Sequence, residues 1–315
     1  MASEKLSLGI DTSNYKTSVA ITSENGEIIF NEQNFLNVNR GERGLRQSDA
    51  LFQHVNRLPD VIAKALTNDS IRKRLGCIAV SNKPRPIEGS YMPVFNAGIA
   101  AAKTLSAALN IPLYYFSHQE GHIEAIRYYS NMKNVNPIIC FHFSGGTTEA
   151  VLVNEKEKIF KIVGGSKDIS YGQVIDRVGV SLGIDFPCGN FMDSLASCNQ
   201  NADILTPIKV SDGYFNLSGI ETQCQRILTE HSDKEIACCL FFRISQSIEK
   251  MTLQLSKKYN INNFIFAGGV SCSTYIRDYI KEHLKDKINY TFGKPELSAD
   301  NAVGISLLGG KNIWL

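Results

Sequence analysis

The sequence lacks the features that would direct a chain out of the cytoplasm. Its eight cysteines contain no C-x-x-C pair and no paired spacing typical of a disulfide framework. No basic stretch followed by an apolar core opens the chain, and no apolar run approaches the length needed to cross a bilayer. We therefore expect a reduced, cytoplasmic protein that is neither secreted nor inserted in a membrane.

A strong excess of one charge is also missing. Lys and Arg number 33 against 31 Asp and Glu, and a formal charge of +2 is too small to make the whole surface bind nucleic acid. Basic clusters at residues 72–74 and 83–85 are large enough only for a local patch, and such runs are more often plain solvated surface. With 43% hydrophobic residues in 315, the chain is globular and long enough for two separate cores.

One pattern occurs twice: an apolar strand, a tight turn of small and hydroxyl residues, and a second apolar strand. The copies span residues 6–22 and 138–153. Such turns leave backbone N–H groups and hydroxyls open to an anionic phosphate. A single turn of this kind is as often an ordinary surface hairpin. Two copies in corresponding places indicate two related halves that bind a phosphate-bearing ligand.

Strands and helices alternate along the rest of the chain, which predicts mostly parallel sheets with helices on both faces. The helix expected over 48–65 would bury a face made of Leu51, Val55, Leu58 and Ile62. A pair of glycines, Gly268 and Gly269, follows a short apolar strand directly, at the end of a strand where α/β folds bind ligands. Other expected helices cover residues 90–109, 173–182, 190–200 and 233–257, and other expected strands cover 27–31, 77–80, 113–116, 159–163 and 264–267.

Two histidines give the clearest chemical pattern. Ser117 is a plausible cap for a helix in which His118 and His122 share one face, at a spacing suited to metal ligands, although a chance pair is the equal alternative. Glu120 would point to the other side of this helix. A zinc peptidase would then lack its general base, which disfavours that function. Asp300 is the best candidate for a third ligand of an iron(II) or zinc site, and a plain helix cap is its alternative.

These pieces, in this order, resemble one family over nearly the whole chain: the TsaD family, formerly called glycoproteases, within the actin, Hsp70 and sugar-kinase superfold. The matching positions are Gly9 to Asp11 with Thr17 and Ser18, Gly89 and Ser90, His118 to His122, Ser144 to Thr148, Gly172 with Asp176, Leu182 and Gly183 with Pro187 and Gly189, Phe215 to Gly219, Gly268 to Val270, and Asp300 to Ala302.

The resemblance implies an α/β fold of two actin-like, ribonuclease H-like lobes with a nucleotide cleft between them. The first lobe would be residues 1–132 with the C-terminal helix 300–315, and the second residues 133–299. It also implies transfer of a threonylcarbamoyl group from an acyl-adenylate to an adenine beside the tRNA anticodon. Helper proteins of the same tRNA-modification pathway would be partners.

Residue by residue, the resemblance makes His118, His122 and Asp300 the ligands of one iron or zinc ion. An ATP- or AMP-type adenine nucleotide, or the acyl-adenylate, would contact Phe143, Ser144, Gly145, Gly146, Asp176, Gly189, Gly269 and Ser273. From its own chemistry, Asp176 would face a cleft or pair with Arg177.

The chain departs from the family pattern where substrates are contacted. Asn14, Tyr15 and Lys16 replace an acidic pair, Glu221 replaces a lysine, and residues 47–52 and 83–86 replace two family runs. Lys16 would stabilise the leaving phosphate as a catalytic residue, together with the strand-borne Asp11. Two other functions stay open: a carbamoyltransferase with an acceptor other than tRNA, and a non-catalytic nucleotide-binding paralogue. A kinase is disfavoured because neither hairpin turn has a carboxylate placed to activate a hydroxyl, apart from the strand-borne Asp11.

Overall fold

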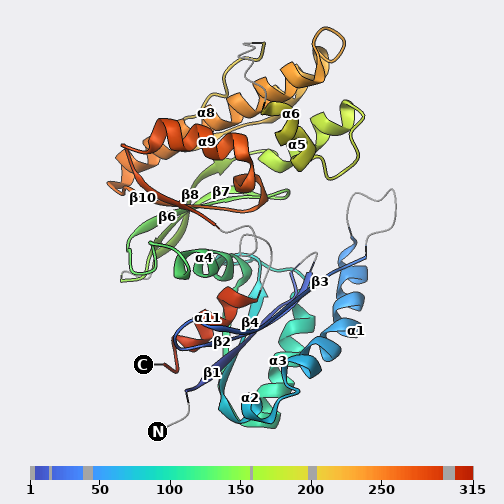
Figure 1. The fold of residues 1–315 in the computed structure, drawn as a ribbon, viewed down its shortest axis with the longest axis vertical. Helices are drawn as coiled ribbons and strands as arrows, with labels where there is room; N and C mark the ends of the chain where they lie inside the picture. The colour runs from blue at the N-terminus through green and yellow to red at the C-terminus, as the bar shows by residue number, and fades with distance from the viewer. Residues whose placement is uncertain are drawn as a thin grey trace. The chain divides into compact units, whose positions relative to one another are not determined.

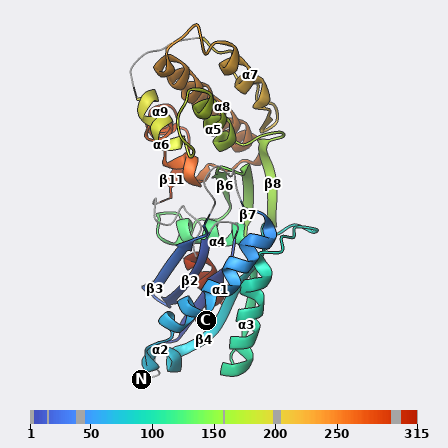
Figure 2. The same ribbon diagram turned by 90° about the vertical axis from the view of Figure 1, so that its right-hand side faces the viewer.

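Two compact units make up the chain in a computed structural model, which describes residues 4–13, 16–37, 45–156, 159–197, 204–293 and 302–314. The first unit is Met1–Tyr129 together with Glu296–Leu315, and the second is Ser130–Pro295. Each unit has its own sheet and helices (Figures 1 and 2). The C-terminal residues therefore pack with the N-terminal part of the chain.

The first unit is built on a five-stranded mixed sheet in the order β3-β2-β1-β4-β5. The antiparallel pairs are β1 with β2 and β2 with β3, and β4 lies parallel to both β1 and β5. β1 and β2 are buried along their whole length, as expected for the centre of a sheet covered on both faces. The strands are β1 (Leu6–Asp11), β2 (Lys16–Ser23), β3 (Ile28–Phe35), β4 (Leu75–Lys83) and β5 (Leu113–Ser117).

Five described helices belong to this sheet: α1 (Gln47–Ala65), α2 (Asp69–Arg74), α3 (Phe95–Leu109), α4 (His118–Tyr128) and α11 (Val303–Gly310). α1 and α3 contact the sheet and each other, whereas α11 packs on β1, β2, β4 and α4. The α4–α11 contact is very close, because a side chain at Gly304 would lie 1.8 Å from the Gly121 carbonyl oxygen. α11 is thereby fixed directly beside the helix that carries His118 and His122.

Helix α1 buries a different face from the predicted one. Val55 is 54% exposed, although Leu58 and Ile62 are buried as expected. The true face includes His54, which is fully buried. Apolar periodicity misjudged the phase because a histidine with a hydrogen-bond partner occupies a core position.

Two other expected helices differ at their ends. The helix expected from residue 90 begins at Phe95, two residues after Pro93, since proline has no N–H to donate to a preceding carbonyl and disfavours a helix that runs through it. The helix expected over 190–200 is α6 (Gly189–Ala196), and residues 198–200 lie outside the described part of the chain.

The second unit repeats the arrangement of the first. Its sheet has the order β11-β10-β6-β7-β8-β9, with β6, β7 and β8 antiparallel in turn and β6, β10 and β11 parallel. Without β9, this is the order of the first sheet, with the second hairpin in the place of the first. The predicted relation between the two halves is confirmed. The strands are β6 (Ile138–Phe143), β7 (Thr148–Asn154), β8 (Ile159–Ser166), β9 (Tyr214–Phe215), β10 (Asn263–Ala267) and β11 (Asn289–Phe292).

The core of the second unit joins this sheet to its longest helix, α8 (Asp233–Tyr259). Ser232 and Glu235 form a capping box at its start, and Asn260 ends it in the left-handed conformation. Phe141 stacks on three other phenylalanines of β6 and β10 at centroid distances of 5.1–5.6 Å. The other helices are α5 (Tyr171–Ser181), α7 (Ser218–Arg226), α9 (Thr274–Leu284) and the short 3-10 helix η1 (Gly269–Cys272). Within the described ranges, no helix is both long and apolar enough to span a membrane.

Candidate functional site

Helix α4 presents the two histidines as its local sequence predicts. Ser117 caps the helix: its hydroxyl accepts from the Glu120 N–H, and the Glu120 carboxylate accepts from the Ser117 N–H at 2.7 Å. Glu120 is thus held at the helix start. The His118 and His122 Nε2 atoms lie 2.9 Å apart, so both rings point to the same place.

This pair fits a metal ion. Two imidazole nitrogens that bind one ion at right angles, each at about 2.0–2.1 Å, lie about 3 Å apart. The Asp11 carboxylate accepts a hydrogen bond from His118 Nδ1 at 2.7 Å, which fixes the proton on Nδ1 and leaves Nε2 to coordinate. The described residues contain no complete group of three or more His, Cys, Asp or Glu ligands. Asp300, the expected third ligand, lies outside the described residues.

Asp11 serves His118 from inside the unit. Its side chain is 1% exposed, and its second oxygen accepts from the Ser13 N–H at 2.8 Å. Both carboxylate oxygens therefore have protein partners. The Asp11 carboxylate is placed to orient the His118 ring. In this arrangement Asp11 is a positioning residue, and the catalytic role expected from the sequence stays a prediction.

The first hairpin turn is tied to three helices and is not an open phosphate loop at its described residues. The Thr12 hydroxyl donates to the Val94 carbonyl at the start of α3 and accepts from the Gly98 N–H. Thr17 shares a hydrogen bond of 2.9 Å with His54 Nδ1 of α1. These hydroxyls are buried and engaged, unlike the exposed ones that the sequence led us to expect.

His54 is a polar residue of this site that the sequence analysis missed. It is fully buried, and burial lowers the pKa of His54 to about 4, against smaller opposing effects of the Ser13 backbone and the Asp11 carboxylate. His54 is therefore neutral near pH 7. Its spacing of four residues from Ala50 and from Leu58 is the sequence signal that would have placed it in the core.

Lys16 lies at the start of β2 and is 7% exposed. Its ammonium donates to Gln33 Oε1 at 3.1 Å and lies 4.5 Å from the centre of the Phe35 ring. Both contacts are on the neighbouring strand β3. The expected role of Lys16 toward a phosphate stays a prediction.

The second hairpin turn is open where the first is closed. Gly145 and Gly146 are exposed, and a side chain at either position would meet no atom within 4 Å. The Ser144 hydroxyl accepts from the Thr147 N–H at 3.0 Å and shapes the turn. The Phe143 ring is fully buried in the aromatic core, and the expected contact of this residue with a nucleotide stays a prediction.

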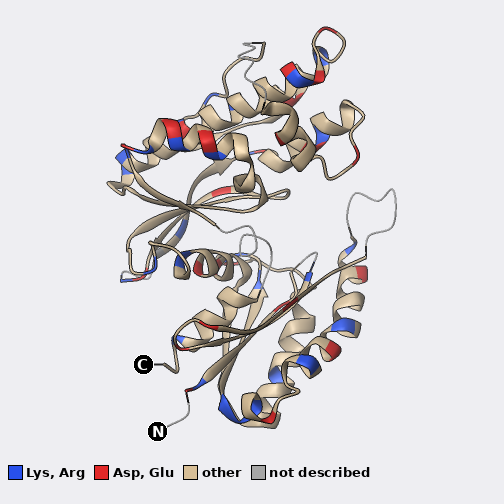
Figure 3. Cartoon of the chain, viewed as in Figure 1, with Lys and Arg blue, Asp and Glu red and all other residues tan. Residues whose placement is uncertain are grey.

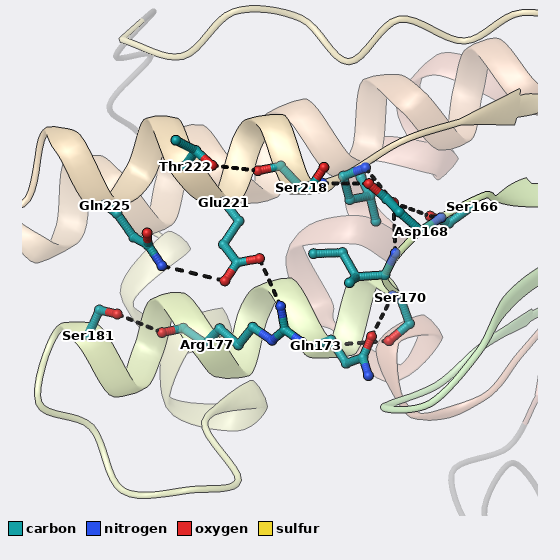
Figure 4. A network of polar contacts seen from close by, with 12 residues as sticks. Ser166, Asp168, Ser170, Gln173, Arg177, Ser181, Ser218, Glu221, Thr222 and Gln225 are labelled. Atoms are coloured by element: carbon teal, nitrogen blue, oxygen red, sulfur yellow. Dashed lines mark hydrogen bonds and ion pairs between the residues drawn. The ribbon is translucent and has the colours of Figure 1, made fainter.

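A hydrogen-bond network joins the segment that leads into α5 to helix α7 (Figure 4), and Ser170 of this segment also bonds the second turn. Ser170 caps α5 and donates to the Gly145 carbonyl oxygen at 2.7 Å. The Asp168 carboxylate accepts from the Leu217 and Ser218 N–H groups, which holds the pKa of Asp168 far below its usual range despite partial burial. Helices α5 and α7 are thereby anchored to the loop that supports Gly145.

Asp176 supports a second glycine turn. Its carboxylate accepts from the Cys188 N–H at 2.8 Å, one residue before Gly189, and burial raises its pKa. The alternative of an Asp176–Arg177 pair is wrong, because Arg177 pairs with Glu221 at 3.1 Å (Figure 4). Gly189 has open space around its Cα.

A third glycine turn follows β10. Gly269 has open space where a side chain would be, whereas Gly268 has φ +87° and lies against the Phe143 backbone. Ser273 differs from the expectation: its hydroxyl donates to Asp193 and accepts from the Ile276 N–H as the cap of α9. Its polar atom is used within the protein.

Comparison with known proteins gives one consistent family. The family model described as "TsaD: tRNA N6-adenosine threonylcarbamoyltransferase" matches residues 29–307. A tRNA N6-adenosine threonylcarbamoyltransferase from Pediococcus pentosaceus is 30% identical over 98% of this chain and 91% of its own length. One from Thermodesulfovibrio yellowstonii is 31% identical over 96% of this chain and 93% of its own.

Solved structures agree on the fold. HypF from T. kodakarensis has a TM-score of 0.65 at 12% identity; it covers 97% of this chain, which spans about half (47%) of HypF. The Acidaminococcus fermentans (R)-2-hydroxyglutaryl-CoA dehydratase component A has a TM-score of 0.58 at 14% identity and covers 98% of both chains. A ROK family glucokinase from Streptomyces griseus has a TM-score of 0.54 at 12% identity, covering 97% of this chain and 99% of its own. These likenesses confirm the predicted actin-like α/β fold class.

Proposed function

This chain belongs to the tRNA N6-adenosine threonylcarbamoyltransferase family, and we propose that it transfers a threonylcarbamoyl group from an acyl-adenylate to an adenine of tRNA. The observation that carries the proposal is the pair of converging His118 and His122 Nε2 atoms, oriented by Asp11. A family activity that needs a bound ion requires this kind of preset ligand pair.

In the proposed reaction, the adenine amine attacks the carbonyl carbon of the mixed anhydride. A C–N bond forms, the bond from that carbon to the phosphate oxygen breaks, AMP leaves, and the amine loses a proton. One divalent ion, iron or zinc, would polarise the carbonyl as a Lewis acid. His118 and His122 would hold it, and Asp11 keeps His118 in the tautomer that coordinates.

Asp300 completes the ligand set in this proposal, by resemblance. In the sequence, Asp300 stands two residues before Ala302, which is buried. Two residues after Ala302, Gly304 touches the backbone of Gly121, the neighbour of His122 in α4.

The adenine nucleotide would be held by the second unit. Gly145, Gly146, Gly189 and Gly269 all have open space in place of a side chain, which lets a ligand approach the backbone closely. Helper proteins and a cytoplasmic location are part of the proposal. The seven described cysteines are all free thiols, as expected in a reducing compartment.

The direct test supplies threonylcarbamoyl-adenylate and unmodified tRNA, with and without helper proteins of the pathway, and measures modified adenosine by mass spectrometry. We expect transfer by the parent chain and a loss of about 10²-fold or more in His118→Ala, the scale of removing a charge-stabilising group. His231→Ala, on the half-exposed His231, is the matched control and should transfer normally. Transfer to a small-molecule acceptor alone, or adenylate binding without transfer, would overturn the proposal in favour of the two alternative functions.

The part assigned to Lys16 has its own test. Lys16→Glu places a negative charge where a phosphate is expected, so AMP should bind about tenfold more weakly or worse. Lys103→Glu, at an exposed position of α3, makes the same charge change and should have little effect. Unchanged AMP affinity of Lys16→Glu by calorimetry would remove Lys16 from the phosphate site.

A further inference from the structure

We propose that His54 is a positioning residue that controls the tautomer and placement of the His118–His122 pair through the first hairpin turn. Its importance for catalysis rests on the proposed function. Its effect on the two imidazoles follows from contacts inside the first unit and is measurable without substrate.

The described part of the turn is fastened by one helix at each of three points. Asp11 is bonded to His118 of α4, Thr12 to the Val94 carbonyl at the start of α3, and Thr17 to His54 of α1. The fastening to α1 therefore depends on the ring of His54.

A short path leads from His54 to the metal-binding nitrogens. The ring bonds Thr17 of β2 at 2.9 Å. The next residue of β2, Ser18, pairs with Asp11 of β1 across the hairpin, and Asp11 Oδ2 accepts from His118 Nδ1 at 2.7 Å. His54 thus acts on Asp11 through the two strands that flank the turn.

Burial excludes direct chemistry by His54. Both His54 and Thr17 are 0% exposed, so neither atom of this hydrogen bond reaches a substrate. His54 cannot be a general base, and Thr17 cannot be a nucleophile. What remains is control of geometry, because the buried imidazole holds Thr17, and with it the β2 side of the turn, through a fixed hydrogen bond.

Loss of the ring contact has a specific consequence. With Thr17 released from α1, β2 shifts against β1 beside the turn, and the Asp11 carboxylate no longer keeps one orientation. His118 then exchanges its ring proton between Nδ1 and Nε2, and a protonated Nε2 cannot coordinate a metal.

The test compares five variants with the parent chain in metal-free form. His54→Leu and Thr17→Val remove the hydrogen bond, and His54→Asn keeps a polar group close to the position of Nδ1. Thr252→Val is the matched control, since Thr252 is also fully buried and its hydroxyl donates to a carbonyl of its own helix, that of Ile248. Asp11→Asn is the positive control.

Nitrogen chemical shifts of the histidine rings give the first readout. We expect the parent, His54→Asn and Thr252→Val to carry the His118 proton on Nδ1. His54→Leu and Thr17→Val should show averaging between tautomers. Cobalt(II) titration gives the second readout, with affinity about tenfold lower in these two variants, the smaller end of the range for groups behind a metal ligand.

Unchanged ring shifts in both His54→Leu and Thr17→Val would overturn the proposal, as would averaged tautomers in the parent chain. If His54→Leu does not fold, Thr17→Val removes the same bond and decides alone. A failure of the tRNA reaction with the expected ring shifts would instead count against the proposed function, because the ring shifts are measured without metal or substrate.

Discussion

Single residues in this protein derive their roles from which of their polar atoms are already bonded. Asp11 has both carboxylate oxygens occupied and acts on His118. Ser273 and Asp193 satisfy each other at the start of α9. Gly145 and Gly269, in contrast, are defined by open space. Residue type suggested Asp11, Ser273, Gly145 and Gly269 as site residues. Their hydrogen bonds distinguish the residues that support a site from those whose surroundings leave room for a ligand.

His54 predicts a pH dependence of stability at the residue scale. Its pKa is about 4 in the folded chain and 6.5 when exposed, so between these values the unfolded chain binds more protons and stability rises with pH. The effect is absent above about pH 6.5 and costs on the order of 3 kcal/mol as pH falls toward 4. His54→Asn should flatten this part of the curve, measured by urea unfolding at each pH.

The control for this prediction is Thr252→Val, which changes a fully buried position without a titratable group and should leave the slope unchanged. Equal slopes in the parent and His54→Asn between pH 4 and 6.5 would show that His54 titrates normally. The carboxylate of Asp11 and the guanidinium of Arg57 act on the same ring in opposite directions. Neither is altered by either substitution.

At the scale of elements, the two hairpins have the same topology and different uses. The first turn is fastened to α1, α3 and α4 through Asp11, Thr12 and Thr17. The second turn accepts a hydrogen bond from the Ser170 hydroxyl at the Gly145 carbonyl oxygen, and Gly145 and Gly146 remain exposed. One hairpin therefore holds the helix that carries His118 and His122, and the other leaves its backbone exposed, although their sequences look alike.

Adjacent glycines after β10 give a prediction for this scale. Gly268→Ala should cost roughly 1–3 kcal/mol of stability, because φ is +87° and the new Cβ would lie 2.3 Å from the Phe143 carbonyl oxygen. Gly269→Ala should leave stability within about 0.5 kcal/mol and weaken AMP binding, since its Cβ points into open space. Denaturation and calorimetric titration separate the two effects. Equal stability losses, or full AMP affinity in Gly269→Ala, would contradict the assignment of Gly269 to the nucleotide site.

For the whole molecule, each unit carries its own core. Leu8 is fully buried in the first and Phe141 in the second. Basic and acidic residues are interspersed on both units in the view of Figure 3, in agreement with the formal charge of +2. This mixture of charges does not make the surface positive as a whole. In the proposed function, recognition of tRNA would therefore depend on local basic residues and on partner proteins.

Separate cores predict separate unfolding. The one tryptophan of the chain, Trp314, belongs to the first unit and its indole donates to the Lys5 carbonyl, so its fluorescence reports on that unit. Leu8→Ala should lower the fluorescence-detected melting temperature, and Phe141→Ala should lower only the circular dichroism transition, each by the equivalent of about 3–5 kcal/mol. A single transition that moves equally in both probes for both variants would show that the units unfold together.

The features of this protein that depend on residues close together in the chain were predictable from the amino-acid sequence alone. The capping box of Ser117 and Glu120 sets the phase of α4, so the shared face of His118 and His122 was readable from four-residue spacing. Alternating apolar strands and helices, with a repeated hairpin, likewise specified two related α/β halves. These are short-range rules of backbone geometry, and they need no knowledge of the fold.

Hydrogen bonds between residues far apart in the chain became visible in the folded structure and were not predictable from the sequence. His54 and Thr17 are 37 residues apart, and Asp11 and His118 are 107 residues apart. No local pattern encodes such contacts, because they arise when several elements pack around one turn and bury their polar atoms together. That burial makes Asp11 a support for His118, puts His54 in the core in place of Val55, and encloses the Phe143 ring among other aromatic rings.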